Sequence, residues 1–329
     1  MRIISPKPYR VFQRGGSAKI RLESETEITS CDISVTDIRS GAPIVSQVHN
    51  QVCREGAFYV TQLLVPQGGW YALTVSANGV SASVEPFGVG EVFVIAGQSH
   101  ATNSNNKQFR VREPEGRITV YEPSGGNWRV AHDRQPCYDS CDYNSRFGSL
   151  WPVTFDNLFD KIQLPIGMTN AAYGATALFQ WMPGHESGFF DNLLTCCRAA
   201  ESFRAIMWQQ GESDVMWHTE TDVYVEGMKK LKRALDDALG FKTKWLVAKS
   251  TIHPSVYTDP EHEGKIRAAD DILWNTDGFY PGPDTDTLTG DCRDAPQTFS
   301  GHMTEKGQLM AGQLWAEVLA DFIGKDLKQ

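Results

Sequence analysis

Residues 91–106 constrain the fold of this chain more than any other stretch of the sequence. The consecutive apolar residues Val92 to Ile95 lead to Gly97 and then into a run of small polar residues. An apolar, β-branched segment that does not alternate is typical of a strand buried on both faces of a parallel sheet, and the glycine favours a turn. We therefore expect a buried strand that delivers Ser99 into a loop at the carboxyl edge of the sheet, where open α/β sheets bind ligands.

Ser99 is a candidate nucleophile because a serine that opens a helix can point its hydroxyl and its own N–H at one substrate carbonyl. A lone Gly-x-Ser segment is more often an ordinary turn, so the assignment depends on further segments of the chain. Serine is a weak nucleophile until a base takes its proton, and histidine has the pKa that suits this task near neutrality.

Residues 1–88 contain short β-rich segments about 8–12 residues apart, a spacing typical of a small antiparallel sandwich. Asn78 and Gly79 form a strong hairpin signal. From residue 89 onwards, strand patterns alternate with helix patterns, which indicates an α/β domain. We expect an immunoglobulin-like β-sandwich accessory domain over 1–88, a catalytic domain over 89–329, and N-terminal strands at residues 9–12, 18–22, 31–36, 58–64, 71–76 and 80–84.

The second part of the chain carries strong periodic patterns for helices and buried strands. Residues 105–148 are polar and rich in Pro and Gly, so we expect loops and a hairpin there. The last helical pattern places His302 immediately before a closing helix. The predicted helices cover residues 150–161, 190–204, 219–240 and 304–323, and the predicted strands cover 164–170, 205–208 and 245–248.

Charge and hydropathy exclude several classes of function. A formal net charge of -9 and a pI near 5.4, without any basic run, argue against a nucleic-acid partner. No apolar stretch approaches the ~20 residues of a membrane span, and the N-terminus lacks the apolar core of a secretory signal. The sequence as written is expected to be cytoplasmic, with a mature secreted form and an excised domain as alternatives.

Cysteine and histidine patterns predict no metal site. The seven cysteines are odd in number and too sparse for a disulfide framework, so most are expected to be free thiols. Cys137 and Cys141 are spaced for pairing but lack nearby histidine ligands for zinc. His253 and His262 have no carboxylate or cysteine that the sequence identifies at ligand spacing, and each is expected to be an ordinary loop histidine.

Three blocks of the sequence resemble the SGNH hydrolase superfamily, in its subgroup of sialate O-acetylesterases and acetylxylan esterases. Residues 97–101, Gly-Gln-Ser-His-Ala, resemble the family's Gly-Gln-Ser-Asn-Ala block, with His100 in place of Asn. Residues 173–181 resemble its Gly-Gly-Thr-x-Ile-x-x-Trp block, and residues 208–214, Trp-x-Gln-Gly-Glu-Ser-Asp, resemble the third. The resemblance covers residues 88–323 and implies a flavodoxin-like three-layer α/β/α fold.

The resemblance also implies an activity, the removal of O-acetyl groups from a carbohydrate such as an acetylated glycan, xylan or sialic acid. In that scheme Ser99 is the nucleophile and His302 acts first as general base and then as general acid. The oxyanion is held by the N–H groups of Ser99 and Gly174 and by the side chain of Gln210. A carboxamide N–H can donate to an oxyanion without titrating, and the scheme requires no cofactor or metal.

The orienting acid of the triad is not assigned by the resemblance. The family has Asp three residues before its histidine, whereas this chain has Phe299 there. Three solutions remain open: Asp294 further along the loop, Glu212 beside Gln210, or a dyad in which a backbone carbonyl holds His302. We favour the dyad, with Asp294 second.

Two rival functions follow from the same residues. An α/β-hydrolase would need Gly-x-Ser-x-Gly, but position 101 is Ala, and Ser99 follows the first strand of its domain. The missing Asp before His302 motivates the second rival, a catalytically weak or inactive carbohydrate-binding protein. One or two aromatic residues near the blocks are expected to stack on sugar, from the candidates Trp151, Trp181, Trp217 and Tyr257.

Overall fold

The computed structural model describes residues 1–139, 147–252, 258–294 and 302–328. The strands are β1 (Arg2–Ser5), β2 (Arg10–Gln13), β3 (Ala18–Glu23), β4 (Ser30–Asp37), β5 (Pro43–Gln51), β6 (Cys53–Glu55), β7 (Phe58–Leu63), β8 (Gly68–Ala77), β9 (Val80–Gly97), β10 (Ile118–Glu122), β11 (Asn127–Val130), β12 (Ile166–Asn170), β13 (Ala205–Gln209), β14 (Trp245–Lys249) and β15 (Phe279–Asp284). The helices are α1 (Trp151–Ile162), α2 (Phe189–Ala200), α3 (Glu212–Met216), α4 (Thr221–Leu239), α5 (Pro260–Leu273) and α6 (Glu305–Asp326).

A large sheet in the order β11-β10-β12-β9-β13-β14-β15 forms the centre of the C-terminal part. Its strands from β10 to β15 are parallel, and β11 pairs with β10 as an antiparallel edge hairpin. Without the β10–β11 hairpin, the remaining strands β12-β9-β13-β14-β15 have the spatial order second, first, third, fourth, fifth in the chain. This order reverses between β9 and β13, and in doubly wound sheets ligands bind at such a reversal. The prediction of an α/β fold is confirmed.

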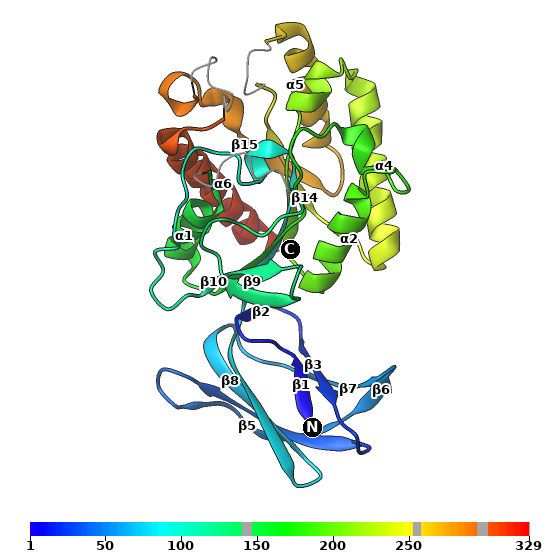
Figure 1. The fold of residues 1–329 in the computed structure, drawn as a ribbon, viewed down its shortest axis with the longest axis vertical. Coiled ribbons are helices and arrows are strands. Elements are labelled where there is room, and N and C mark those ends of the chain that lie inside the picture. The colour runs from blue at the N-terminus through cyan, green and yellow to red at the C-terminus, as the bar shows by residue number, and fades with distance from the viewer. Residues whose placement is uncertain (140–146, 253–257, 295–301, 329) are drawn as a thin grey trace.

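Helices cover both faces of this sheet, with α1 and α6 on one side and α2, α4 and α5 on the other (Figure 1). Alternate residues of β9 enter the two layers: Val92 and Val94 pack with α2 and α4, whereas Phe93 and Ile95 pack with α1 and α6. This double burial explains why the apolar run in β9 shows no alternation.

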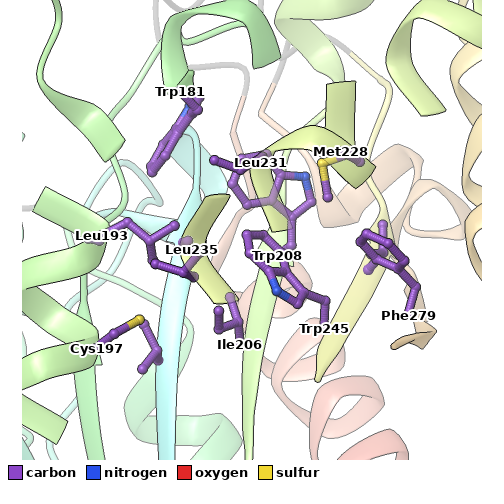
Figure 2. Close-up of a cluster of buried hydrophobic side chains, with 14 of the residues drawn as sticks. Trp181, Leu193, Cys197, Ile206, Trp208, Met228, Leu231, Leu235, Trp245 and Phe279 are labelled. Atoms are coloured by element: carbon purple, nitrogen blue, oxygen red, sulfur yellow. The ribbon is translucent and has the colours of Figure 1, made fainter. Parts of the chain in front are cut away.

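Three tryptophans anchor the apolar cluster on the α2 and α4 face. Figure 2 shows Trp208 and Trp245 in the middle of this cluster, with Trp181 at its upper left. The ring centroids of Trp208 lie 5.1 Å from Trp181 and 5.7 Å from Trp245. All three are fully buried, so this face of the sheet is a packed core and the site must lie at the strand ends.

The N-terminal part has its own apolar cluster between two sets of strands. One sheet has the order β1-β3-β7-β6, and in the other β4 pairs with β5 and β8, while β8 pairs with β9. Ile20, Ile33 and Leu73 are among the residues that fill the space between them. In Figure 1 this part lies at the end of the molecule opposite the helical layers.

Strand β9 connects the two parts without a break. The sequence analysis expected one strand that ends at Val84 and a separate one near Val92, but a single strand of 18 residues runs from Val80 to Gly97. The β8–β9 register shifts between the pairs Leu73–Val84 and Tyr71–Phe87. Such an irregularity accommodates Pro86, which cannot donate to a ladder.

Several elements were missed by the sequence analysis, among them β1, β5, β6, α3, α5 and β15. The last of these contains Pro281 and Pro283, which are signals for a loop. β15 pairs only with β14 at the edge of the sheet, where proline is tolerated. Within the described ranges, the helices include none that is long and apolar enough to cross a membrane.

Candidate active site

Ser99 lies at the carboxyl end of the central strand β9, as the sequence predicts. It opens a short 3-10 turn, Ser99–Ala101, and its side chain is largely buried. Gly97 has a φ of +130°, and a Cβ at this position would lie 2.1 Å from the carbonyl oxygen of Gln209. Only glycine therefore allows β9 and β13 to approach closely enough to hold Ser99 at the reversal point of the sheet.

Gly174 lies beside Ser99. A Cβ built on Gly174 would be 3.8 Å from the Ser99 Cβ and 2.7 Å from an Asp139 carboxylate oxygen. The Gly174 N–H donates to that same oxygen over 2.9 Å. The N–H expected to bind an oxyanion thus already holds an anionic oxygen next to the candidate nucleophile, and Asp139 is a site residue that the sequence analysis did not identify.

Gln210 lies at the end of β13 and is completely buried. Its carboxamide nitrogen lies 2.9 Å from the Thr176 carbonyl oxygen, 2.6 Å from Asp214 Oδ2 and 3.2 Å from Gln98 Oε1. Its oxygen accepts from the Tyr224 hydroxyl over 2.9 Å. Because a carboxamide nitrogen carries only two hydrogens, Gln210 could donate to an oxyanion only by giving up one of these bonds.

His302 is brought to the residue that follows Ser99. The imidazole rings of His100 and His302 meet edge to face, with centroids 5.1 Å apart. Asn105 joins the two segments, because its Oδ1 lies 3.2 Å from His100 Nδ1 and accepts from the Met303 N–H over 3.3 Å. His100, which replaces the asparagine of the resembling family, is therefore part of the site.

Asp294 lies next to His302 because the described segments on either side of residues 295–301 pair with each other. The Asp294 N–H donates to the His302 carbonyl over 2.9 Å, and Arg293 and Met303 form an antiparallel bridge. Asn106 Nδ2 donates to Asp294 Oδ1, which fixes this carboxylate against the loop that follows Ser99. Phe299 falls within 295–301, outside the described residues.

Glu212 is completely buried near His100. Its Oε1 accepts from the Ser250 hydroxyl over 2.7 Å and lies 3.6 Å from His100 Nε2. Burial raises the pKa of Glu212 to about 8, although the Ser250 hydrogen bond acts in the opposite direction. Glu212 is therefore mostly protonated at neutral pH, and it approaches His302 through the ring of His100.

Arg293 completes the environment of His100. Its guanidinium Nη1 lies 3.2 Å from His100 Nε2, while its Nε donates to the Leu288 carbonyl over 2.8 Å. With a guanidinium donor at Nε2, the proton of a neutral His100 belongs on Nδ1, toward Asn105. Arg293 was also not predicted as a site residue, because the neighbouring sequence does not indicate that this segment contacts His100.

No group of histidine, cysteine or acidic side chains around Ser99 is spaced to share a metal ion, within the residues that the structure describes. One such group lies elsewhere and consists of His218, Asp259 and His262. The expectation that His262 has no carboxylate at ligand spacing is therefore wrong, because Asp259 lies one helical turn before it. His253 lies outside the described residues.

The cysteines that the structure describes are free thiols: Cys31, Cys53, Cys137, Cys196, Cys197 and Cys292. Cys141 lies outside the described residues, and Cys137, which is spaced for pairing with it, is free.

Comparison with known proteins connects this geometry to a family. A family model described as carbohydrate esterase, sialic acid-specific acetylesterase, matches residues 89–320. This range includes every strand of the central sheet after the first part of β9, together with Ser99, Gly174, Gln210 and His302. No curated protein matches the chain.

Two solved structures are similar to the chain at low sequence identity. A carbohydrate acetylesterase of Xanthomonas citri is 17% identical, with 95% of this chain and 72% of that chain covered and a TM-score of 0.62. A protein of Arabidopsis thaliana is 16% identical, with 70% of this chain and 98% of that chain covered and a TM-score of 0.54. At these identities the similarity establishes the fold alone.

Proposed function

This chain belongs to the sialic acid-specific acetylesterase family of carbohydrate esterases, and from that premise we propose that it removes O-acetyl groups from a carbohydrate by serine catalysis. As a member of the family it is a carboxylic ester hydrolase. The observation that carries the proposal is the Gly174 N–H, which lies beside Ser99 and holds a carboxylate oxygen at 2.9 Å. A backbone N–H that binds an anionic oxygen next to a serine is the arrangement that acyl transfer requires.

In the proposed mechanism, Ser99 Oγ attacks the acetyl carbonyl carbon while His302 takes the hydroxyl proton. The tetrahedral oxyanion accepts from the N–H groups of Ser99 and Gly174, in place of Asp139. Its collapse breaks the bond to the sugar oxygen, to which His302 returns the proton, and leaves an acetyl group on Ser99. Water then attacks the acetyl carbon while His302 takes its proton. Collapse of this second intermediate breaks the bond to Ser99 Oγ, which receives the proton back from His302, and acetate leaves.

Gln210 is proposed as the third oxyanion donor, which requires that one of its present hydrogen bonds breaks. Its N–H toward Thr176 or Asp214 would have to turn toward the oxyanion when substrate binds. The same contacts support a positioning role, because the bond from Gln210 to the Thr176 carbonyl ties the end of β13 to the segment that carries Gly174.

Two carboxylates are candidates for orienting His302, and a dyad needs neither. Asp294 is next to His302 through a backbone hydrogen bond, whereas Glu212 reaches it through His100 and is mostly neutral near pH 7. These contacts favour Asp294 over Glu212. Because an orienting acid contributes ~10³–10⁴ in kcat, Asp294→Asn should lose that factor, whereas Glu212→Gln should stay within tenfold of wild type. If both variants stay within tenfold, a backbone carbonyl holds His302.

Exposed aromatic side chains that follow the site segments in the chain support a carbohydrate substrate. Trp151 and Trp181 are fully buried core residues, and Tyr257 lies outside the described residues. Trp217 is 66% exposed and Phe179 is 44% exposed, and their rings meet at 5.3 Å. They follow the Gln210 and Gly174 segments in the chain, and we assign them to the stacking of a sugar ring.

The domain division is part of the same proposal. Residues 1–88 are an accessory β-sandwich, supported by their separate apolar cluster, and residues 89–329 are a flavodoxin-like three-layer SGNH hydrolase domain, supported by the strand order and the two helical layers.

A second candidate function, a catalytically weak carbohydrate-binding protein, is favoured by one observation: Asp139 occupies the Gly174 N–H. The test is acetate release from acetylated xylan, sialic acids and other acetylated glycans, with p-nitrophenyl acetate in parallel. Ser99→Ala should lose ~10⁴–10⁶ in turnover with the fold intact. Turnover by Ser99→Ala above a tenth of wild type would reject the serine mechanism, and binding without turnover by the wild type would establish the second candidate.

A further inference from the structure

Two histidines and one aspartate converge between α3 and α5, away from the residues that contact Ser99. His218 follows α3, Asp259 caps the N-terminus of α5, and His262 lies in its first turn. One ligand atom from each residue can be chosen so that all lie within 4.8 Å of one another. The ligands come from two separate elements, so their approach is a feature of the fold and not of one helix end.

Both imidazoles are directed at the same carboxylate oxygen. Asp259 Oδ2 lies 2.6 Å from His262 Nδ1 and 3.4 Å from His218 Nε2. The other oxygen, Oδ1, accepts the His262 backbone N–H over 3.2 Å, which serves the helix cap. The two rings stack with centroids 4.0 Å apart at an interplanar angle of 16°. One carboxylate oxygen and one nitrogen of each ring are therefore close together, although the stacked rings would have to turn to direct both nitrogens at one ion.

Neighbouring contacts hold the two elements together around this point. The Thr221 hydroxyl donates to the Lys265 carbonyl over 2.9 Å, and the Lys265 ammonium binds Glu220 over 2.8 Å. These bonds join the start of α4, just after His218, to the middle of α5. The ligands are thus brought together by the protein before any ion arrives, which lowers the cost of ordering them.

We propose that His218, Asp259 and His262 bind a divalent transition-metal ion, with Zn²⁺ as the best-suited ion. Zn²⁺ takes histidine nitrogens and carboxylate oxygens at ~2.0–2.2 Å, so tetrahedral ligands lie about 3.4 Å apart. The 3.4 Å between Asp259 Oδ2 and His218 Nε2 matches this separation, whereas the 2.6 Å hydrogen bond between Asp259 Oδ2 and His262 Nδ1 would have to open when the ion binds. Three protein ligands leave a fourth position for water. Imidazole and carboxylate ligands favour Zn²⁺, Ni²⁺ or Cu²⁺ over the harder Mg²⁺.

The bound ion would stabilise one edge of the active site. α3 begins two residues after Gln210, at the end of β13. α5 comes after β14, the strand that neighbours β13 in the sheet. A metal bound between His218 and the start of α5 would therefore tie together two loops at the carboxyl edge of the sheet. Its role is structural, because none of its ligands contacts Ser99 or His302 in the described contacts.

Calorimetric titration of the full-length, untagged and chelator-treated protein with Zn²⁺ tests the proposal. We expect one ion per chain, and His218→Ala and His262→Ala should each weaken binding at least a hundredfold. The matched control is His49→Ala, because His49 Nδ1 forms a 3.0 Å pair with Asp32 but has no third ligand among the residues that the structure describes. This control should bind Zn²⁺ like the wild type.

A second measurement keeps the test decisive if His262→Ala loosens the cap of α5. His218 lies outside any helix and its side chain is 55% exposed, so His218→Ala should fold normally. Zn²⁺ should raise the melting temperature of the wild type and of His49→Ala but not that of His218→Ala. Binding weaker than millimolar, or equal binding and stabilisation in His218→Ala, would overturn the proposal and leave Asp259 as a helix cap bonded to His262.

Discussion

Replacement of Glu212 by Gln should change the pH dependence of folding stability. Because this carboxyl group is buried, the wild type should lose stability relative to the variant as the pH rises. Glu212 is fully buried, and its pKa is raised from 4.5 to about 8. The folded protein therefore keeps the Glu212 proton over a pH range in which the unfolded chain releases it. The stability that this proton contributes is fully present below pH 4.5 and is lost as the pH rises through about 8.

The magnitude follows from the size of the pKa difference. A shift from 4.5 to about 8 corresponds to a total of about 5 kcal/mol at 1.36 kcal/mol per pH unit. Between pH 5 and pH 9 the wild type should lose about 4 kcal/mol relative to Glu212→Gln, with the larger share lost below pH 7. Gln has nearly the same shape and still accepts from Ser250, so the variant removes the titration with little repacking.

The assay is urea unfolding of the wild type and Glu212→Gln at pH 5, 7 and 9, compared as the difference in the free energy of unfolding. Other buried carboxyl groups, such as Asp270, contribute equally to both proteins and cancel in this difference. Glu23→Gln is the control, since Glu23 pairs with Arg2 at the surface and should change stability by less than about 1 kcal/mol. A difference that stays constant from pH 5 to pH 9 would refute the reasoning and mean that Glu212 is ionised in the folded protein, with Arg293 as its counter-charge.

Three further substitutions test the remaining parts of the site. Gly174→Ala should lower kcat ~10²–10³-fold on p-nitrophenyl acetate with folding unchanged by circular dichroism, because the new Cβ enters the space beside Ser99; an unchanged kcat would remove Gly174 from the oxyanion site. Asp139→Ala should raise kcat/KM up to about tenfold, because substrate no longer displaces a charge-assisted hydrogen bond, and a fall in kcat/KM would instead make Asp139 a participant in catalysis. Trp217→Ala should raise KM for an acetylated glycan about tenfold and leave p-nitrophenyl acetate turnover unchanged; equal effects on both substrates would contradict sugar stacking.

Patterns within single segments were predictable from the sequence. Val92 to Ile95 could be identified as a strand buried on both faces because all four consecutive side chains are apolar. The strand-to-turn placement of Ser99 and the helix after His302 followed from similar local signals. β15 was not predictable in this way, since its prolines are tolerated only because the strand lies at the edge of the sheet.

Contacts between distant segments could not be derived from spacing. The return of Asp294 to His302 depends on a backbone hydrogen bond across a loop, and the approach of Arg293 to His100 depends on the same return. The pKa of Glu212 depends on complete burial, which a short polar block does not reveal. His262 was judged without Asp259 because the helix that places them one turn apart was not recognised.

The unbroken course of β9 makes the two parts of this chain mechanically inseparable. A cut at residue 88 would divide a strand in the middle and remove β2, whose residues Arg10 to Gln13 pair with Phe87 to Gly90. It would also take away Gln13 and Arg14, which bind the fully buried carboxylate of Glu91. Of the ion-pair partners that the described residues provide for Glu91, Arg204 would then remain. Force applied to the N-terminal strands is therefore transmitted along one continuous backbone to the residue pair Gly97 and Gln98, directly before the nucleophile.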